Sequence, residues 1–214
     1  MNPAIDAFRT PQEAFWAGDF GNDYIGRNEA DPAALAGNLH FFTRALGSVR
    51  PAPGSICELG ANIGLNLRAL KLLYPQARQT CVEINARAVD RLRHDGVGDE
   101  VVHGSILNFT PGRTFDLVLI KGVMIHLSPD MLPAVYRKLA DCSARHVLIA
   151  EYYNRRPEEV LYHGHEGRLF RRDFGGGFMD VCPEFALADY GFSYHRDPRE
   201  QQDDLTWFLF ERRA

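Results

Sequence analysis

Short apolar runs alternate with longer stretches of helical spacing between residues 54 and 153. The apolar runs are SICEL, QTCVEI, EVVHG, TFDLVLIKG and RHVLIAEYY, and the stretches between them include LNLRALKLLYP, ARAVDRLRHDG and PDMLPAVYRKLADC. Strands that alternate with helices of this length form βαβ units, in which helices cover both faces of a parallel sheet. The sequence therefore predicts an α/β fold with a doubly wound, mostly parallel sheet.

The segments that flank this core have a different character. Residues 1–50 predict a helical cap, and the polar, aromatic-rich residues 154–180 predict a lid or an acceptor-binding insertion. The run CPEFALADYG predicts a helix, and the β-rich runs within residues 190–214 predict an antiparallel hairpin that closes the sheet. Because no linker divides the chain, all 214 residues are expected to form a single domain around the core of residues 54–153.

The composition argues against nucleic-acid and membrane partners. The chain carries 24 basic and 28 acidic side chains and a net charge of -4, which argues against binding to a nucleic-acid backbone. No apolar run approaches the roughly 20 residues of a membrane span, so a membrane partner is not expected. The four cysteines form no CxxC pair, and the first residues lack the apolar core of a secretion signal, so we predict a reduced, cytoplasmic protein.

A glycine-containing loop follows the first predicted strand, in the sequence ELGANIG from Glu58 to Gly64. Loops at this position bind ligands in α/β sheets, because glycine allows close approach and the next helix presents free N–H groups. Glu83 ends the second predicted strand, 19 residues beyond Gly64, where a carboxylate can accept both hydrogen bonds of a ribose diol. Loop and acid together predict a nucleotide-type ligand; the alternative is that Gly60 and Gly64 serve only a tight turn and helix packing.

The spacing of the glycines discriminates between nucleotide ligands. A dinucleotide loop has the pattern GxGxxG, whose middle glycine admits the pyrophosphate. Here the pattern is ExGxxxG, and Asn62 stands at the place of that middle glycine. A ligand with a ribose and no pyrophosphate is favoured, which fits S-adenosylmethionine. An NAD-dependent oxidoreductase and a non-catalytic nucleotide-binding module are the alternatives.

Several motifs resemble known families. ELGANIG, VEIN, GSIL and FDLVLIKG resemble the motifs of class I S-adenosylmethionine-dependent methyltransferases. FWAGDFGNDYIGRN, KGVMIHLSPD, LIAEYYN, GHEGRLFRRDF, DYGFSYHRDP and DDLTWF resemble the pseudaminic acid biosynthesis-associated methylases. The resemblance implies a seven-stranded sheet with a final antiparallel strand. It also implies methylation of an oxygen or nitrogen of a small polar acceptor, such as a nonulosonic acid sugar or its precursor.

The resemblance further implies a cofactor site. It sets the methionine moiety against the glycine loop, the ribose on Glu83, the adenine beside Ser105 and the sulfonium near Lys121. The adenine-edge position is often acidic in related enzymes, and Ser105 departs from that pattern. The predicted cofactor-binding residues are Glu58, Gly60, Ala61, Asn62, Gly64, Glu83, Ile84, Ser105, Ile106, Lys121 and Gly122, with Tyr24, Arg27 and Asn28 of the cap.

Two histidines are candidate catalytic residues. His126 follows the fourth predicted strand and suits proton uptake near neutral pH; the alternative is that it packs against or caps the helix that follows. His165 lies in the titratable segment YHGHEGR of the predicted lid. The HxHE spacing there is not a strong metal motif, so no metal site is predicted.

Polar residues beyond the fifth predicted strand and in the lid are expected to line the acceptor pocket. Tyrosine and amide side chains can recognise a polar acceptor, although tyrosines also cover cores. An arginine can hold a carboxylate or phosphate on the acceptor. The candidate substrate-binding residues are Tyr152, Tyr153, Asn154, His163, Glu166 and Arg168. The sequence leaves the oligomeric state open.

Overall fold

The structure, a computed structural model, describes residues 8–26, 30–199 and 202–213. Its centre is a seven-stranded sheet with the strand order β3-β2-β1-β4-β5-β9-β8, in which β9 alone runs in the opposite direction and pairs antiparallel with both β5 and β8. The strands of this sheet are β1 (Ser55–Leu59), β2 (Arg78–Glu83), β3 (Glu100–His103), β4 (Phe115–Lys121), β5 (Ser143–Glu151), β8 (Phe185–Ser193) and β9 (Leu205–Arg212). The predicted α/β fold with a mostly parallel sheet and a closing antiparallel hairpin is confirmed.

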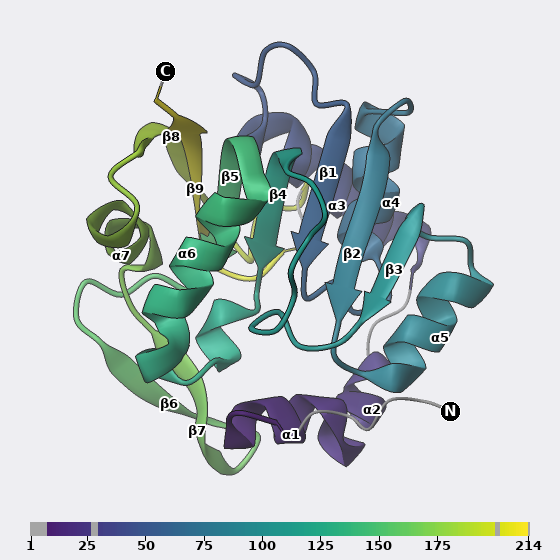
Figure 1. The fold of residues 1–214 in the computed structure, drawn as a ribbon. Coiled ribbons are helices and arrows are strands. Elements are labelled where there is room, and N and C mark those ends of the chain that lie inside the picture. Colours follow the sequence, from purple (N-terminus) through teal and green to yellow (C-terminus); the bar gives the residue numbers. More distant parts are fainter. Residues whose placement is uncertain (1–7, 27–29, 200–201, 214) are drawn as a thin grey trace.

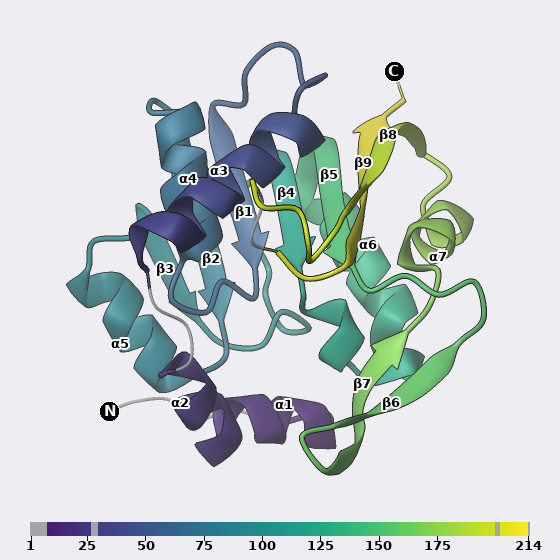
Figure 2. The same ribbon diagram turned by 180° about the vertical axis from the view of Figure 1, so that it is seen from behind.

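Helices cover both faces of the sheet (Figures 1 and 2). One face is covered by α3 (Pro32–Ala45) and α4 (Leu65–Leu73), with α5 (Ala86–His94) toward the β3 edge. The opposite face is covered by α6 (Leu132–Cys142) and α7 (Phe174–Val181). Within the described ranges no helix combines the length and apolar character that a bilayer span requires.

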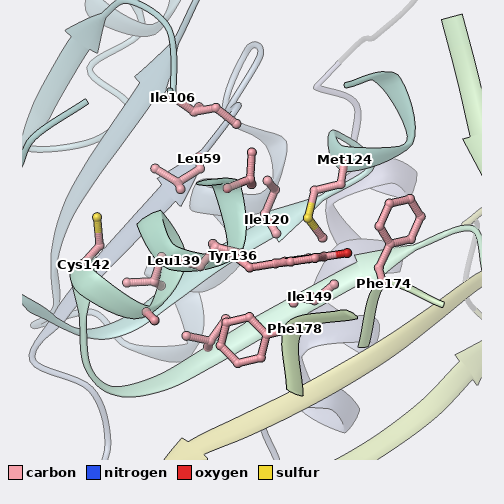
Figure 3. Packing of buried hydrophobic residues seen from close by; sticks show 14 of the residues in the cluster. Leu59, Ile106, Ile120, Met124, Tyr136, Leu139, Cys142, Ile149, Phe174 and Phe178 are labelled. Atoms are coloured by element: carbon pink, nitrogen blue, oxygen red, sulfur yellow. The ribbon is translucent and has the colours of Figure 1, made fainter. Parts of the chain in front are cut away.

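The central strands are apolar on both faces because both faces are buried. In β4, Leu117 and Leu119 contact the cluster under α3 and α4, whereas Val118 and Ile120 belong to the cluster under α6 and α7. Figure 3 shows this second cluster, in which Tyr136, Phe174 and Phe178 pack together with Met124. The continuous apolar run of a doubly covered strand is therefore a direct consequence of the fold.

Two separate segments lie beyond the carboxyl ends of the parallel strands (Figure 1). The first contains the short helices α1 (Pro11–Ala17) and α2 (Asp19–Ile25), and α1 begins at a capping box formed by Thr10 and Glu13. The second is a two-stranded hairpin of β6 (Glu158–Tyr162) and β7 (His165–Arg171). We call these two segments together the roof of the sheet edge.

One predicted element is wrong. Residues 182–191 were expected to be helical, but Phe185 begins β8, which pairs antiparallel with β9 along Phe185–Ser193. The helix lies earlier, in the glycine-rich run FGGGFMDV of α7, where Asp173 accepts a hydrogen bond from the Gly176 N–H. Glycine disfavours helices, but a Cβ at Gly175 would lie 2.7 Å from the Phe208 ring, and one at Gly177 would lie 2.8 Å from the Tyr136 hydroxyl. Close packing therefore selects glycine in this helix.

We predict that Gly175→Ala destabilises the protein by about 1–3 kcal/mol, because the new methyl group overlaps the Phe208 ring. This loss is expected although alanine raises helix propensity by about 1 kcal/mol. The measurement is urea unfolding, with Gly112→Ala as the control, since no atom lies within 4 Å of a Cβ built at Gly112. A Gly175→Ala protein as stable as the control would contradict the packing explanation.

Candidate functional site

A cavity of about 1100 Å³ lies between the carboxyl edge of the sheet and the roof. Its floor is formed by the segments that follow β1, β2, β3 and β4, and its walls include residues of α1, α2 and α3. Tyr162 and His163 at the tip of the β6–β7 hairpin and residues between β8 and β9 complete the lining. The cavity therefore sits at the edge where parallel α/β sheets bind ligands.

The loop between β1 and α4 approaches the cavity closely. Gly60 and Gly64 have φ of +83° and +79°, and a Cβ at either would overlap the side chain of Val123 or of Val97 and Leu92. Asn62 also adopts a left-handed conformation with φ of +48°, which asparagine tolerates better than most residues. Gly60 and Asn62 line the cavity, whereas Gly64 serves the turn and the packing against α5.

Glu83 is a buried carboxylate at the cavity floor. Its Oε2 accepts the Asn62 N–H at 2.7 Å, and its Oε1 accepts the Asn85 N–H at 2.8 Å. Burial raises the pKa of Glu83, and these backbone hydrogen bonds oppose the shift. A carboxylate has about four lone-pair sites, and the backbone N–H groups of Asn62, Asn85 and Ile84 hydrogen-bond to this one, so acceptor capacity remains for a ligand in the cavity.

The loop after β4 is held by a second buried carboxylate. Glu151, at the end of β5, accepts backbone N–H groups of Val123, Met124 and Ile125 at distances of 2.8–3.4 Å. Burial raises its pKa to about 7, and the three N–H bonds oppose this shift. The arrangement fixes the short 3₁₀ helix η1 (Met124–His126) at the cavity wall.

His126 lies at the end of η1 and contacts the roof. Its Nδ1 lies 2.7 Å from the Arg168 carbonyl oxygen of β7, so Nδ1 carries the proton and donates it, and Nε2 keeps its lone pair. The ring packs against Trp16 and Tyr162, with centroids 4.6 Å and 4.9 Å away. Burial lowers the pKa of His126 to about 4, so the imidazole is neutral at physiological pH.

The structure places most of the predicted cofactor residues around the cavity. Tyr24, Gly60, Ala61, Asn62, Glu83, Ile84, Ser105, Ile106, Lys121 and Gly122 line it. Arg27 and Asn28 lie outside the described residues. Glu58 and Gly64 do not line the cavity. Glu58 accepts a hydrogen bond from Asn66 of α4, and Gly64 packs against Leu92 and Val97.

Some of the predicted catalytic and substrate-binding residues line the cavity and others do not. His126, Tyr152 and His163 line the cavity. Tyr153, Asn154, His165, Glu166 and Arg168 do not. His165 is exposed and packs on Phe15 and Phe20, and the Arg168 guanidinium lies over the Phe15 ring.

Sequence reasoning missed several lining residues. Glu13 of α1 accepts a hydrogen bond from the Ser105 hydroxyl, and Asn85 donates to the Trp16 carbonyl oxygen at 3.0 Å. The signal for Glu13 was present in the capping-box sequence TPQE, which indicates a helix start but not a contact with Ser105. Among the described residues no group of three or more His, Cys, Asp or Glu side chains is placed to hold a metal ion.

The fold is shared with solved methyltransferases. Magnesium protoporphyrin IX methyltransferase from Synechocystis, solved with S-adenosylmethionine, matches with a TM-score of 0.69 and 11% identity over 98% of this chain and 100% of that chain. The 1,6-didemethyltoxoflavin N1-methyltransferase from Burkholderia thailandensis, solved with 1,6-didemethyltoxoflavin and S-adenosylhomocysteine, matches with a TM-score of 0.68 and 16% identity over 99% and 94% of the two chains. An N-methyltransferase from Bradyrhizobium japonicum, solved with S-adenosylhomocysteine, matches with a TM-score of 0.63 and 15% identity over 92% and 100%.

These likenesses establish the Rossmann-like fold that the three methyltransferases share. No protein-family model and no curated protein sequence matches the chain. The resemblance to the pseudaminic acid biosynthesis-associated methylases therefore rests on the sequence motifs alone.

A third buried carboxylate yields a prediction about pH. Glu58 is fully buried, its Oε1 accepts a hydrogen bond from Asn66 at 2.6 Å, and burial raises its pKa to about 8. Because the folded-state pKa exceeds the ordinary value, the protonated acid is the form that folding favours. Its contribution to stability is full below about pH 4.5 and is lost as the pH rises toward 8.

We predict that Glu58→Gln, which has no charge to bury, gains stability relative to the native protein between about pH 5 and pH 8. The gain is at most about 1.4 kcal/mol for each pH unit. Urea unfolding at several pH values measures it, and substitution of the exposed Glu100 by glutamine is the control. A stability difference that is independent of pH would show that Glu58 is ionised in the folded protein.

Proposed function

We propose that the protein is an S-adenosylmethionine-dependent methyltransferase that methylates an oxygen or nitrogen of a small polar acceptor. The observation that carries the proposal is Glu83, a buried carboxylate at the end of β2 that lines the cavity beside the Gly60–Asn62 loop and keeps acceptor capacity for a ligand. The shared fold and the cofactors bound in the similar methyltransferases support the same conclusion.

The residues present fit this cofactor. A carboxylate at the end of β2 is an acceptor suited to the hydroxyl groups of a ribose, and the backbone hydrogen bonds from Asn62 and Asn85 orient Glu83 before a ligand binds. The Asn62 side chain stands where a dinucleotide pyrophosphate would need a glycine. A cavity of about 1100 Å³ is large enough for the cofactor and a small acceptor together.

When bound, the sulfonium supplies a methyl group that an acceptor lone pair takes as the carbon–sulfur bond breaks, which leaves a neutral thioether. The chain has to align the acceptor, and alignment alone supplies much of the acceleration of such a displacement. We assign the acceptor's proton to Nε2 of His126, whose lone pair is kept free by the Nδ1–H bond to Arg168. A weakly basic, neutral imidazole suits an oxygen acceptor, because a hydroxyl proton becomes strongly acidic as the oxygen–methyl bond forms.

The acceptor-side lining favours a small ring-bearing molecule. Trp16, Tyr24, Tyr152 and Tyr162 supply aromatic surface there, and the Tyr152 hydroxyl donates to Asp203 at 2.6 Å. A nonulosonic acid sugar or its precursor is the first acceptor to assay, on the motif resemblance alone. The cysteines Cys57, Cys81, Cys142 and Cys182 are all buried free thiols, which supports the predicted cytoplasmic location.

Calorimetric titration with S-adenosylmethionine, S-adenosylhomocysteine and NAD tests the cofactor. We predict binding of the first two and none of NAD, and a loss of about 10–100-fold in affinity on Glu83→Ala, because a hydrogen bond to a charged acceptor is removed. Circular dichroism checks that the variant is folded, and Glu100→Ala controls for the lost charge. Binding of NAD alone would support the oxidoreductase alternative and contradict the proposal.

His126 is tested separately, by following the release of S-adenosylhomocysteine in the presence of acceptor. We predict that His126→Ala and His126→Gln each lower kcat by about 100–10,000-fold with little change in cofactor affinity. The native rate should be flat near neutral pH and fall as the pH drops below about 5, when the imidazole becomes protonated.

The glutamine variant separates the two roles of His126. Its amide can still donate to the Arg168 carbonyl oxygen but takes up no proton. A His126→Gln protein with near-native kcat would show that the histidine only anchors β7. A native protein that binds the cofactor but methylates no acceptor in an assay of sugars, amines and phenols would instead support the non-catalytic alternative.

A further inference from the structure

Glu13 occupies an unusual position for a capping-box residue. In a capping box the carboxylate serves its own helix, and Oε2 of Glu13 does so by accepting the N–H groups of Arg9 and Thr10 at 2.6 and 3.2 Å. Its Oε1 instead accepts a hydrogen bond from the hydroxyl of Ser105, 92 residues away. The side chain is only 4% exposed and lines the cavity.

The Ser105 hydroxyl already makes one hydrogen bond as donor and one as acceptor. It donates to Glu13 and accepts the N–H of Leu107 at 3.0 Å. Oε1 of Glu13 has a single protein partner in the part of the chain that the structure describes, so a lone-pair site remains on it. The acceptor that this edge of the cavity offers to a ligand is therefore the carboxylate of α1.

The position along the sheet indicates which part of the cofactor meets this carboxylate. The strand order β3-β2-β1 places the end of β3 one strand farther from the glycine loop than Glu83. The end of β3 is held there by pairing of His103 with Glu83 and by the Gly104 N–H, which donates to the Glu83 carbonyl oxygen. A ribose on Glu83 with its methionine side on the loop therefore directs its base toward Ser105, between the apolar side chains of Ile84 and Ile106.

We propose that Glu13 is the base-recognition residue of the cofactor site, and that its Oε1 accepts a hydrogen bond from the exocyclic amine of adenine. This inference rests on the proposed function. It assigns to the first helix of the chain an acceptor that the end of β3 itself lacks. It also makes α1 part of the cofactor site, so that base recognition and docking of the roof depend on the same side chain.

The test compares S-adenosylhomocysteine with S-inosylhomocysteine, in which a carbonyl oxygen replaces the amine. We expect the native protein to bind the adenosine compound at least about 100-fold more tightly, because the inosine oxygen would face a carboxylate. Glu13→Gln should reduce this preference to about 10-fold or less, since the glutamine amide can donate to the inosine oxygen. Calorimetry measures both affinities, and circular dichroism checks that each variant is folded.

Two further variants separate recognition from a purely structural role. Thr10→Ala breaks the capping box without removing the Glu13 carboxylate, so it should weaken both ligands equally and leave their ratio unchanged. Adding Ser105→Asp to Glu13→Gln restores a carboxylate from the other side of the contact, and it should restore the preference for adenosine.

The outcomes distinguish this inference from the proposed function. Tight binding of S-adenosylhomocysteine with the same adenosine-to-inosine ratio in the native, Glu13→Gln and Thr10→Ala proteins overturns the role of Glu13 and leaves the methyltransferase proposal standing. Binding of neither compound by the native protein overturns both. A ratio that falls only in Glu13→Gln and returns in the double variant supports the inference.

Discussion

Buried carboxylates that accept backbone N–H groups hold the cavity floor in place. Glu83 ties the β1–α4 loop to the start of α5, and Glu151 ties the segment after β4 to the end of β5. Burying a carboxylate is costly unless hydrogen bonds satisfy it, so these residues keep their positions only while the loops keep theirs. This mutual dependence lets irregular segments at a sheet edge present a preorganised surface to a ligand.

The sequence predicted those parts of the fold that local pattern determines. Buried strands such as β4 and β5 were recognised because both of their faces are apolar, and the ELGANIG loop was recognised because its glycines and Glu83 have a diagnostic spacing. The helix α7 was missed because its glycines are required by close packing against Phe208 and Tyr136, which are distant in sequence. For the same reason the helix predicted over residues 182–191 is wrong, because pairing with β9 makes a strand from Phe185 onward.

The site shows the same division between local and long-range information. Residues in the loop and at strand ends were predicted, since the carboxyl edge of a parallel sheet is fixed by topology. His165 was grouped with His163, but only His163 lines the cavity, because the hairpin turn with positive φ at His163 and Gly164 reverses the chain between them. The place of Glu13 in the cavity could not be predicted, because the capping box alone accounts for a glutamate at this position in the sequence. Its contact with Ser105 arises only from the fold.

The charge of the cavity affects which form of the proposed cofactor it binds more strongly. Its described lining includes the carboxyl side chains of Glu13, Asp31, Glu83 and Asp203, whereas Lys121 is its one lysine or arginine. Lys121 lies over the Phe41 ring and donates to Asn38 at 3.3 Å, so part of its charge is directed into the wall. A cavity with this balance attracts a sulfonium more strongly than the neutral thioether that remains after methyl transfer. In the proposed function, this acidic lining therefore favours exchange of the spent cofactor for a charged one.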